Sequence, residues 1–156
     1  MHQTLLALGA LVLTMFFALS TQESAIHVEQ AKTRSEIETL AGQAALNVLA
    51  HVAAQPFDAA TVAGPVASAA ELTPAAAFPT GRAYAAAADV DDFHRMATYT
   101  YVTADSLLFD VDAEVAYVDE TTAPSATPTF QKEVTVTVGH QLLRQPLSVS
   151  RVVTWP

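Results

Sequence analysis

The sequence predicts an α+β fold: one long N-terminal α-helix, with its apolar half protruding, packed by its C-terminal half on a small antiparallel β-sheet. Three observations predict it. Residues 1–22 contain no Asp, Glu, Lys or Arg. Residues 20–55 contain no proline and one glycine, Gly42, and their apolar residues recur at helical spacing. From residue 98 onward apolar and polar residues tend to alternate, which is the period of a strand.

The long helix is expected from about residue 3 to residue 55, where Pro56 would end it. Its uncharged residues 1–22 rise roughly 33 Å, enough to cross a hydrocarbon core of about 30 Å, so they form a candidate membrane or filament-core segment. The whole helix of residues 1–55 would measure roughly 80 Å against about 30 Å for a small domain. The apolar half would therefore protrude and need a bilayer or other copies of the chain.

The second half of this helix is amphipathic. Its apolar residues recur every three or four positions and predict one buried face: Ile37, Leu40, Ala41, Ala44, Ala45, Val48, Leu49 and Val52. The opposite face carries polar residues such as Glu38, Gln43 and Asn47. This half is therefore expected to pack on the rest of the chain.

Residues 56–156 are expected to form a strand-rich globular domain. It starts with an Ala- and Pro-rich connection over residues 59–88, read as a surface loop with a short helix near residues 67–72. Strands are expected at residues 98–102, 109–117, 132–138 and 147–155. Because they follow one another through short connections, the sheet should be antiparallel. In the second strand Asp110, Asp112 and Glu114 should face solvent.

The charge balance narrows the possible functions. The 156 residues include 7 Lys and Arg against 16 Asp and Glu, a formal net charge of −9. Binding to nucleic acid requires clustered Lys and Arg, so no nucleic-acid partner is expected. The chain contains no cysteine, which excludes disulfides, thiolate zinc sites and a cysteine nucleophile.

The motifs predict no enzyme, no catalytic residue and no cofactor. The sequence has no Gly-x-Ser-x-Gly elbow, and its five glycines form no phosphate-binding loop. Its five histidines show no metal-ligand spacing. The best candidate for an ion site is the group Asp89, Asp91 and Asp92, because carboxylates alternating in a loop suit calcium. The alternative is a solvated acidic turn.

A long N-terminal helix, apolar at first and then amphipathic, followed by a small strand-rich domain, resembles the type IV pilin and pseudopilin family. The helix exit Gln55-Pro56-Phe57-Asp58 is similar to that group. Four further segments look like its strand series: residues 91–94, 109–119, 132–138 and 152–155. The resemblance is to an atypical member, since Leu5 stands where the family has a glutamate and no prepilin leader is visible.

The resemblance implies a structural subunit of an extracellular, pilus-like filament. The chain would be embedded in the inner membrane before assembly, would need an assembly machinery, and would polymerise with itself to reach the cell surface. The filament core would be formed by the large apolar residues of the first segment: Leu5, Leu6, Leu8, Leu11, Val12, Leu13, Met15, Phe16, Phe17 and Leu19.

Two alternatives use the same segment differently. The chain would be a minor pseudopilin or a single-pass, membrane-anchored extracytoplasmic binding domain. A cleaved signal peptide is the other alternative, with Ala18-Leu19-Ser20 as a small-x-small cleavage site. The helix over residues 20–43 separates these alternatives, because a filament needs it apolar enough to pack on neighbouring copies.

Overall fold

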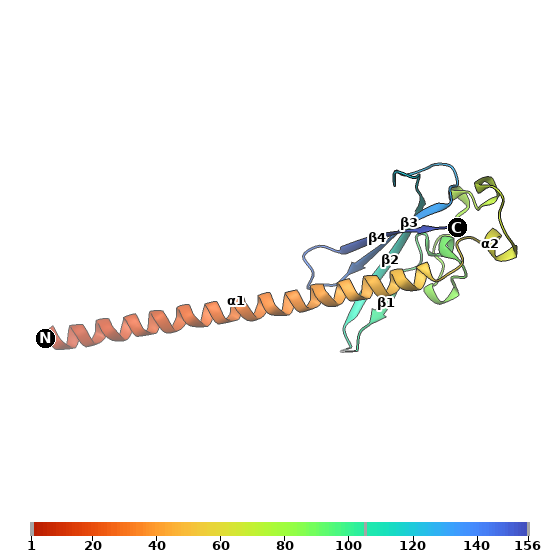
Figure 1. Ribbon diagram of the computed structural model, residues 1–156. Coiled ribbons are helices and arrows are strands. Elements are labelled where there is room, and N and C mark those ends of the chain that lie inside the picture. The colour runs from red at the N-terminus through yellow and green to blue at the C-terminus, as the bar shows by residue number, and fades with distance from the viewer. Residues whose placement is uncertain (1, 105, 156) are drawn as a thin grey trace. The chain divides into compact units, whose positions relative to one another are not determined.

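The computed structural model describes residues 2–104 and 106–155, without the side chains of residues 2, 4–6, 24 and 25. The chain divides into two compact units, Met1–Ile37 and Glu38–Pro156. A single long helix, α1 (His2–Ala53), forms the first unit and begins the second (Figure 1). The predicted class is confirmed: a long N-terminal helix packs against a four-stranded antiparallel sheet.

In the first unit α1 has no covering layer of its own. Every described side chain from Ala7 to Thr33 is exposed. Within it, Thr14 and Thr21 donate their hydroxyls to main-chain oxygens one turn earlier, at 2.8 Å to Ala10 and 3.0 Å to Phe17. These polar groups are therefore satisfied inside the helix, as an apolar environment requires. By length and composition, this part of the chain carries one helix able to cross a membrane, near its N-terminus.

In the second unit α1 buries one face, as its spacing predicts. Seven of the eight predicted residues are buried and Leu40 is half-buried. Ile37 is the last residue of the first unit, and the other buried ones are Ala41, Ala44, Ala45, Val48, Leu49 and Val52. Three of these seven residues are alanines, and the sheet lies in van der Waals contact with the helix. A Cβ added at Gly42 would lie 3.7 Å from the side chain of Leu147. The helix ends at Ala53, two residues before the predicted end.

The sheet is a meander with the strand order β1-β2-β3-β4. Its strands are β1 (Tyr99–Val102), β2 (Leu108–Tyr117), β3 (Gln131–Gly139) and β4 (Leu147–Thr154). These match the four predicted strands within a few residues. Along β2 and β3 every second side chain is buried, and apolar residues pair across the two strands: Val111 with Val138, Ala113 with Val136, and Val115 with Val134. Asp110, Asp112 and Glu114 are exposed, as predicted.

The Ala- and Pro-rich connection has more structure than the predicted loop. It contains α2 (Ala59–Ala63) and three 3-10 turns: η1 (Ala69–Glu71), η2 (Ala75–Ala77) and η3 (Tyr84–Ala86). Between them Leu72 and Phe78 are buried. The connection therefore supplies core side chains to the second unit.

The segment at residues 91–94, compared above with a pilin-like strand, is not a strand. It belongs to a 3-10 turn, η4 (Val90–Phe93), and this prediction is wrong. The reason is local: the side chain of Asp89 accepts a hydrogen bond from the amide of Asp92 at 3.1 Å and caps the turn. Such a cap competes with strand pairing. All four residues of η4 are buried.

Candidate functional site

Among the described residues, two features are candidates for a function: the exposed apolar surface of the first unit and a buried polar cluster in the second. The first holds the predicted filament-core residues. Eight of them are exposed, by 55–75% of their surface: Leu8, Leu11, Val12, Leu13, Met15, Phe16, Phe17 and Leu19. The side chains of the remaining two, Leu5 and Leu6, lie outside the described residues.

This surface surrounds the helix rather than forming a stripe. Leu11, Val12 and Leu13 are consecutive, so they point about 100° apart around the axis, and Phe16 and Phe17 do the same. A helix that is apolar on all sides is normally enclosed by lipid or by protein. The space around Gly9 is open, since a Cβ there would meet no atom within 4 Å.

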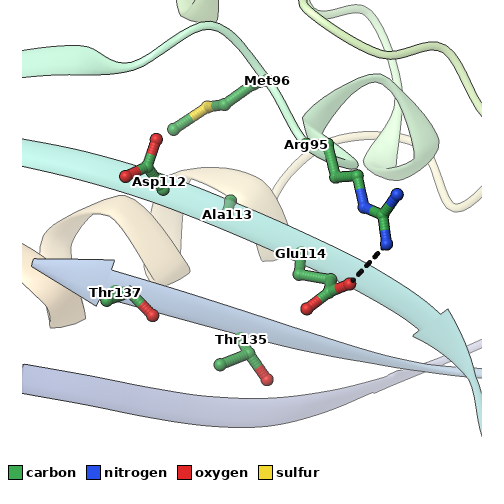
Figure 2. Close-up of a pocket in the computed structure, with 7 residues that line it drawn as sticks. All are labelled: Arg95, Met96, Asp112, Ala113, Glu114, Thr135 and Thr137. Atoms are coloured by element: carbon green, nitrogen blue, oxygen red, sulfur yellow. Dashed lines mark ion pairs between the residues drawn. The ribbon is translucent and has the colours of Figure 1, made fainter.

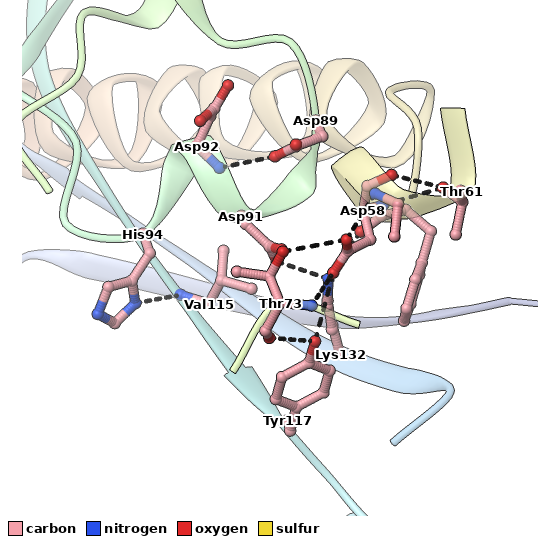
Figure 3. Close-up of polar contacts among 12 residues, drawn as sticks. Asp58, Thr61, Thr73, Asp89, Asp91, Asp92, His94, Val115, Tyr117 and Lys132 are labelled. Atoms are coloured by element: carbon pink, nitrogen blue, oxygen red, sulfur yellow. Dashed lines mark hydrogen bonds and ion pairs between the residues drawn. The ribbon is translucent and has the colours of Figure 1, made fainter. Parts of the chain in front are cut away.

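The polar cluster is built around Lys132 of β3, whose side chain is fully buried (Figure 3). Its Nζ donates to the main-chain oxygen of Phe57 at 2.7 Å. It forms an ion pair with Asp58 at 3.2 Å and lies 2.6 Å from a carboxyl oxygen of Asp91. The ammonium group also lies 4.2 Å from the ring centre of Phe57 and 5.0 Å from that of Tyr117. A buried lysine is rare without such partners.

Asp58 holds this cluster at the start of α2. Its carboxylate caps the helix by accepting from the amide of Ala60 at 2.9 Å, and it accepts from the amide and hydroxyl of Thr73 at 2.9 and 3.1 Å. Burial opposes ionisation of Asp58, but the amides of Ala60 and Thr73 and the charge of Lys132 outweigh it and lower its pKa to about 2. Asp58 is therefore the ionised carboxylate of the cluster.

Asp91 is the second carboxyl group beside Lys132, and its pKa shifts in the opposite direction to that of Asp58. It enters from η4 and faces Asp58 and Lys132 (Figure 3). Burial raises the pKa of Asp91 to about 8, against the opposing attraction of Lys132. Its carboxyl group shares hydrogen bonds with Lys132 and with Asp58. At neutral pH Asp91 is therefore mostly the protonated acid, and it donates to Asp58.

Tyr117 closes the cluster from β2, directly opposite Lys132 in the strand pairing. Its hydroxyl donates to the main-chain oxygen of Thr73 at 2.8 Å. Burial and the nearby carboxyl groups of Asp91 and Asp58 raise the pKa of Tyr117. The phenol therefore stays neutral and acts as a hydrogen-bond donor.

The predicted ion site does not have the geometry of a calcium site. Asp89, Asp91 and Asp92 are all buried, so they are not a solvated turn either. Their carboxyl groups contact three different partners. Asp89 accepts from the main chain and caps η4, Asp91 contacts Lys132, and Asp92 binds Arg82 at 2.7 Å. Among the described residues no group of three or more His, Asp or Glu side chains is arranged to hold a metal ion.

The sequence analysis missed Lys132, Asp58 and Tyr117 as parts of one cluster. One signal was present: Lys132 falls in the same alternating phase as Val134, Val136 and Val138, which places it on the buried face of the strand. A lysine on a buried face requires acidic partners. Which aspartates contact it depends on tertiary packing, since Asp58 lies 74 residues before Lys132 in the sequence.

The opposite, solvent-facing side of the sheet carries a shallow hollow (Figure 2). It is lined by residues of β2 and β3, polar except for Ala113, and by two residues beside them: Arg95, Met96, Asp112, Ala113, Glu114, Thr135 and Thr137. Arg95 and Glu114 lie 3.6 Å apart, and both side chains are more than 60% exposed. Such a pair is screened by water and adds little stability.

The comparisons with known proteins identify no relative. No protein-family model matches the sequence, and neither a curated protein nor a solved structure is significantly similar to it. A function must therefore be argued from the residues themselves.

Proposed function

We propose that the protein is a structural subunit of an extracellular, pilus-like filament that polymerises through the apolar N-terminal half of α1. The observation that carries this proposal is the all-round apolar surface of residues 7–19, on a helix whose continuation belongs to a compact, acidic unit. An apolar surface of this extent is not stable in water. Other copies of the same segment would cover it on every side.

The driving force would be burial. Transfer of one large apolar side chain such as Leu11 or Phe16 from water to an apolar core contributes about 1.5–3 kcal/mol. Eight such side chains are exposed here. Because each subunit would repeat the same head-to-tail contact, the assembly would not close and would grow as a helical polymer. Before assembly the same surface would be covered by the inner membrane, and an assembly machinery would move it.

The charges that follow the apolar segment also fit packing between copies. Glu23 and Glu29 are exposed on the first unit. Lys32 pairs with Glu36 of the same helix at 3.9 Å, an exposed contact that water screens. In a filament the glutamates of one copy would reach Arg34 or Lys32 of the next. Pairs of this kind would fix the register between subunits.

The test is electron microscopy of material sheared from the native cells, with mass spectrometry of the N-terminus in the same sample. Thin fibres that contain the chain with residues 1–22 retained are the expected result. Protein confined to membranes, with no fibres, would contradict the proposal. A mature start near Thr21 would identify a secreted domain and would contradict it equally.

The decisive variants are Leu11→Asp and Phe16→Asp. A charge at the centre of an apolar core or membrane costs about 2.5–3.5 kcal/mol, so both should abolish fibres. Thermal unfolding of the second unit, followed by circular dichroism, should not change. The control is Gln141→Asp, which adds the same charge at an exposed position of the second unit and should leave fibres intact. Fibres that persist in Leu11→Asp would refute the core assignment.

A second candidate is a minor pseudopilin or a membrane-anchored extracytoplasmic domain. The membrane-spanning length and composition of α1 favour it, because one span is sufficient for an anchor. It predicts protein that stays in the membrane fraction and does not sediment as fibres. The fractionation above separates it from the filament.

A further inference from the structure

The buried cluster places an amine against a carboxyl group in the core of the second unit (Figure 3). Nζ of Lys132 lies 2.6 Å from Oδ1 of Asp91, and the two side chains are 0% and 3% exposed. Given a C=O bond near 1.23 Å, Cγ of Asp91 lies at most about 3.9 Å from Nζ. The contact is within hydrogen-bonding distance, so the amine and the carboxyl group already touch in the folded chain.

The walls of the cluster are aromatic. The rings of Phe57, Tyr117 and Phe78 have their centres 4.2, 5.0 and 5.5 Å from Nζ. All three side chains are buried. Such walls keep water away from the amine and the acid, so that a condensation between them is not opposed by bulk water.

We propose that Lys132 and Asp91 join in an intramolecular amide, an isopeptide bond between Nζ and Cγ, formed by the folded chain itself with loss of one water molecule and with Asp58 as the proton-transfer group. The bond would tie η4 to β3. It does not depend on the filament proposed above.

The step balances without any other reactant. The Lys132 ammonium passes a proton to the Asp58 carboxylate along their existing 3.2 Å hydrogen bond. The neutral amine then attacks Cγ of the Asp91 acid and forms the N–C bond. The C–O bond breaks, and the hydroxyl leaves as water with a proton from nitrogen, relayed through Asp58. The products are the amide, one water and protonated Asp58.

Two physical terms favour this reaction. Fixed contact between two reacting groups replaces a bimolecular encounter, and effective molarities for well-oriented groups reach about 10⁵–10⁸ M. The amide also removes charge from an apolar pocket, where a buried ammonium and carboxylate are costly. The protonation of the carboxyl groups fits these roles, since Asp91 is held as the acid and Asp58 as the carboxylate. The uphill proton transfer to Asp58 makes the reaction slow.

Mass spectrometry of the full chain tests the bond directly. The denatured, intact wild-type chain is expected to be lighter by one water than its sequence. After trypsin, cleavage after Lys132 should be lost, and the peptide of residues 83–95 should be attached to that of residues 96–144. Full mass and normal cleavage after prolonged incubation of the folded chain would overturn the proposal. Attachment of residues 35–82, which contain Asp58, would overturn the choice of Asp91.

Variants confirm the roles of the groups. Asp91→Ala should restore the full mass and cleavage after Lys132. Asp91→Asn can still give the same amide, with ammonia leaving instead of water, so any linked product should have the wild-type linked mass. Asp58→Asn removes the proton acceptor and should slow formation at least tenfold. The matched control is Asp119→Asn, at an exposed carboxylate, which should link like the wild type. Linkage at the wild-type rate in Asp58→Asn would refute its role in proton transfer.

Because a misfolded variant would also lack the bond, circular dichroism must accompany each mass measurement. The wild-type result does not depend on any variant, so the proposal stands or falls on it.

Discussion

At the scale of single residues, one buried cation organises the second unit. Lys132 draws together Asp58 from the start of α2, Asp91 from η4 and the main chain of Phe57. Removing one partner of a buried ion pair usually costs about 3–5 kcal/mol, because the other charge is left uncompensated. The cluster therefore fixes how the connecting segment lies against the sheet.

Asp58 should give the fold a specific sensitivity to acid. Its pKa is about 2 in the folded chain against an ordinary value of 3.8, so the folded state binds the proton more weakly than the unfolded state. Ionised Asp58 therefore adds on the order of 2 kcal/mol to the free energy of unfolding. This contribution is present above about pH 4 and is lost as the pH falls through 2. The measurement is the unfolding temperature at pH 6, 4 and 2.

The comparison for this prediction is Asp58→Asn, which keeps a capping side chain but cannot ionise. Its unfolding temperature should be lower at pH 6 and should fall less between pH 4 and 2 than that of the wild type. Parallel curves for the two proteins would show that Asp58 does not carry the acid sensitivity.

At the scale of elements, periodicity predicted those parts whose burial follows a regular pattern. The buried face of α1 and the alternation in β2 could be read from the sequence because each element has one core side. The strand predicted at Asp91 was wrong because capping by Asp89 is decided by a few local hydrogen bonds. The partners of Lys132 could not be predicted from the sequence, since they depend on tertiary contacts.

The small residues on the buried face of α1 should resist enlargement. Ala45 is completely buried, and Ala50, one turn and a half further along the same helix, is exposed. Ala45→Leu should overpack the contact with the sheet and lower the free energy of unfolding by about 1–3 kcal/mol. Ala50→Leu, the matched control, should change it by less than about 0.5 kcal/mol. Equal effects in denaturant titrations would contradict the assigned face.

At the scale of the whole molecule, the two units differ in where their apolar side chains lie. The first carries the exposed apolar side chains and the second carries the core and the sheet. All 16 acidic residues lie beyond residue 22, so the negative charge of the protein belongs to the part of the chain that follows the uncharged segment. An excess of negative charge on that part favours solubility.

Removal of residues 1–34 should therefore leave a soluble protein. The remaining chain keeps every buried residue named above and loses the exposed apolar surface. We expect a single monomer peak in size-exclusion chromatography without detergent and a cooperative thermal transition by circular dichroism. Aggregation, or the loss of a cooperative transition, would show that the first unit is needed for folding.

The position of Lys132 in the sheet also has a mechanical consequence. Tension applied along α1 leaves the helix at Ala53 and reaches Phe57 and Asp58, which are held by Lys132. Lys132 belongs to β3, a strand hydrogen-bonded to neighbours on both sides. An edge strand peels away one bond at a time, whereas an interior strand yields only when two ladders shear together. Tension along α1 therefore acts on β3, an interior strand, which resists extension better than an edge strand.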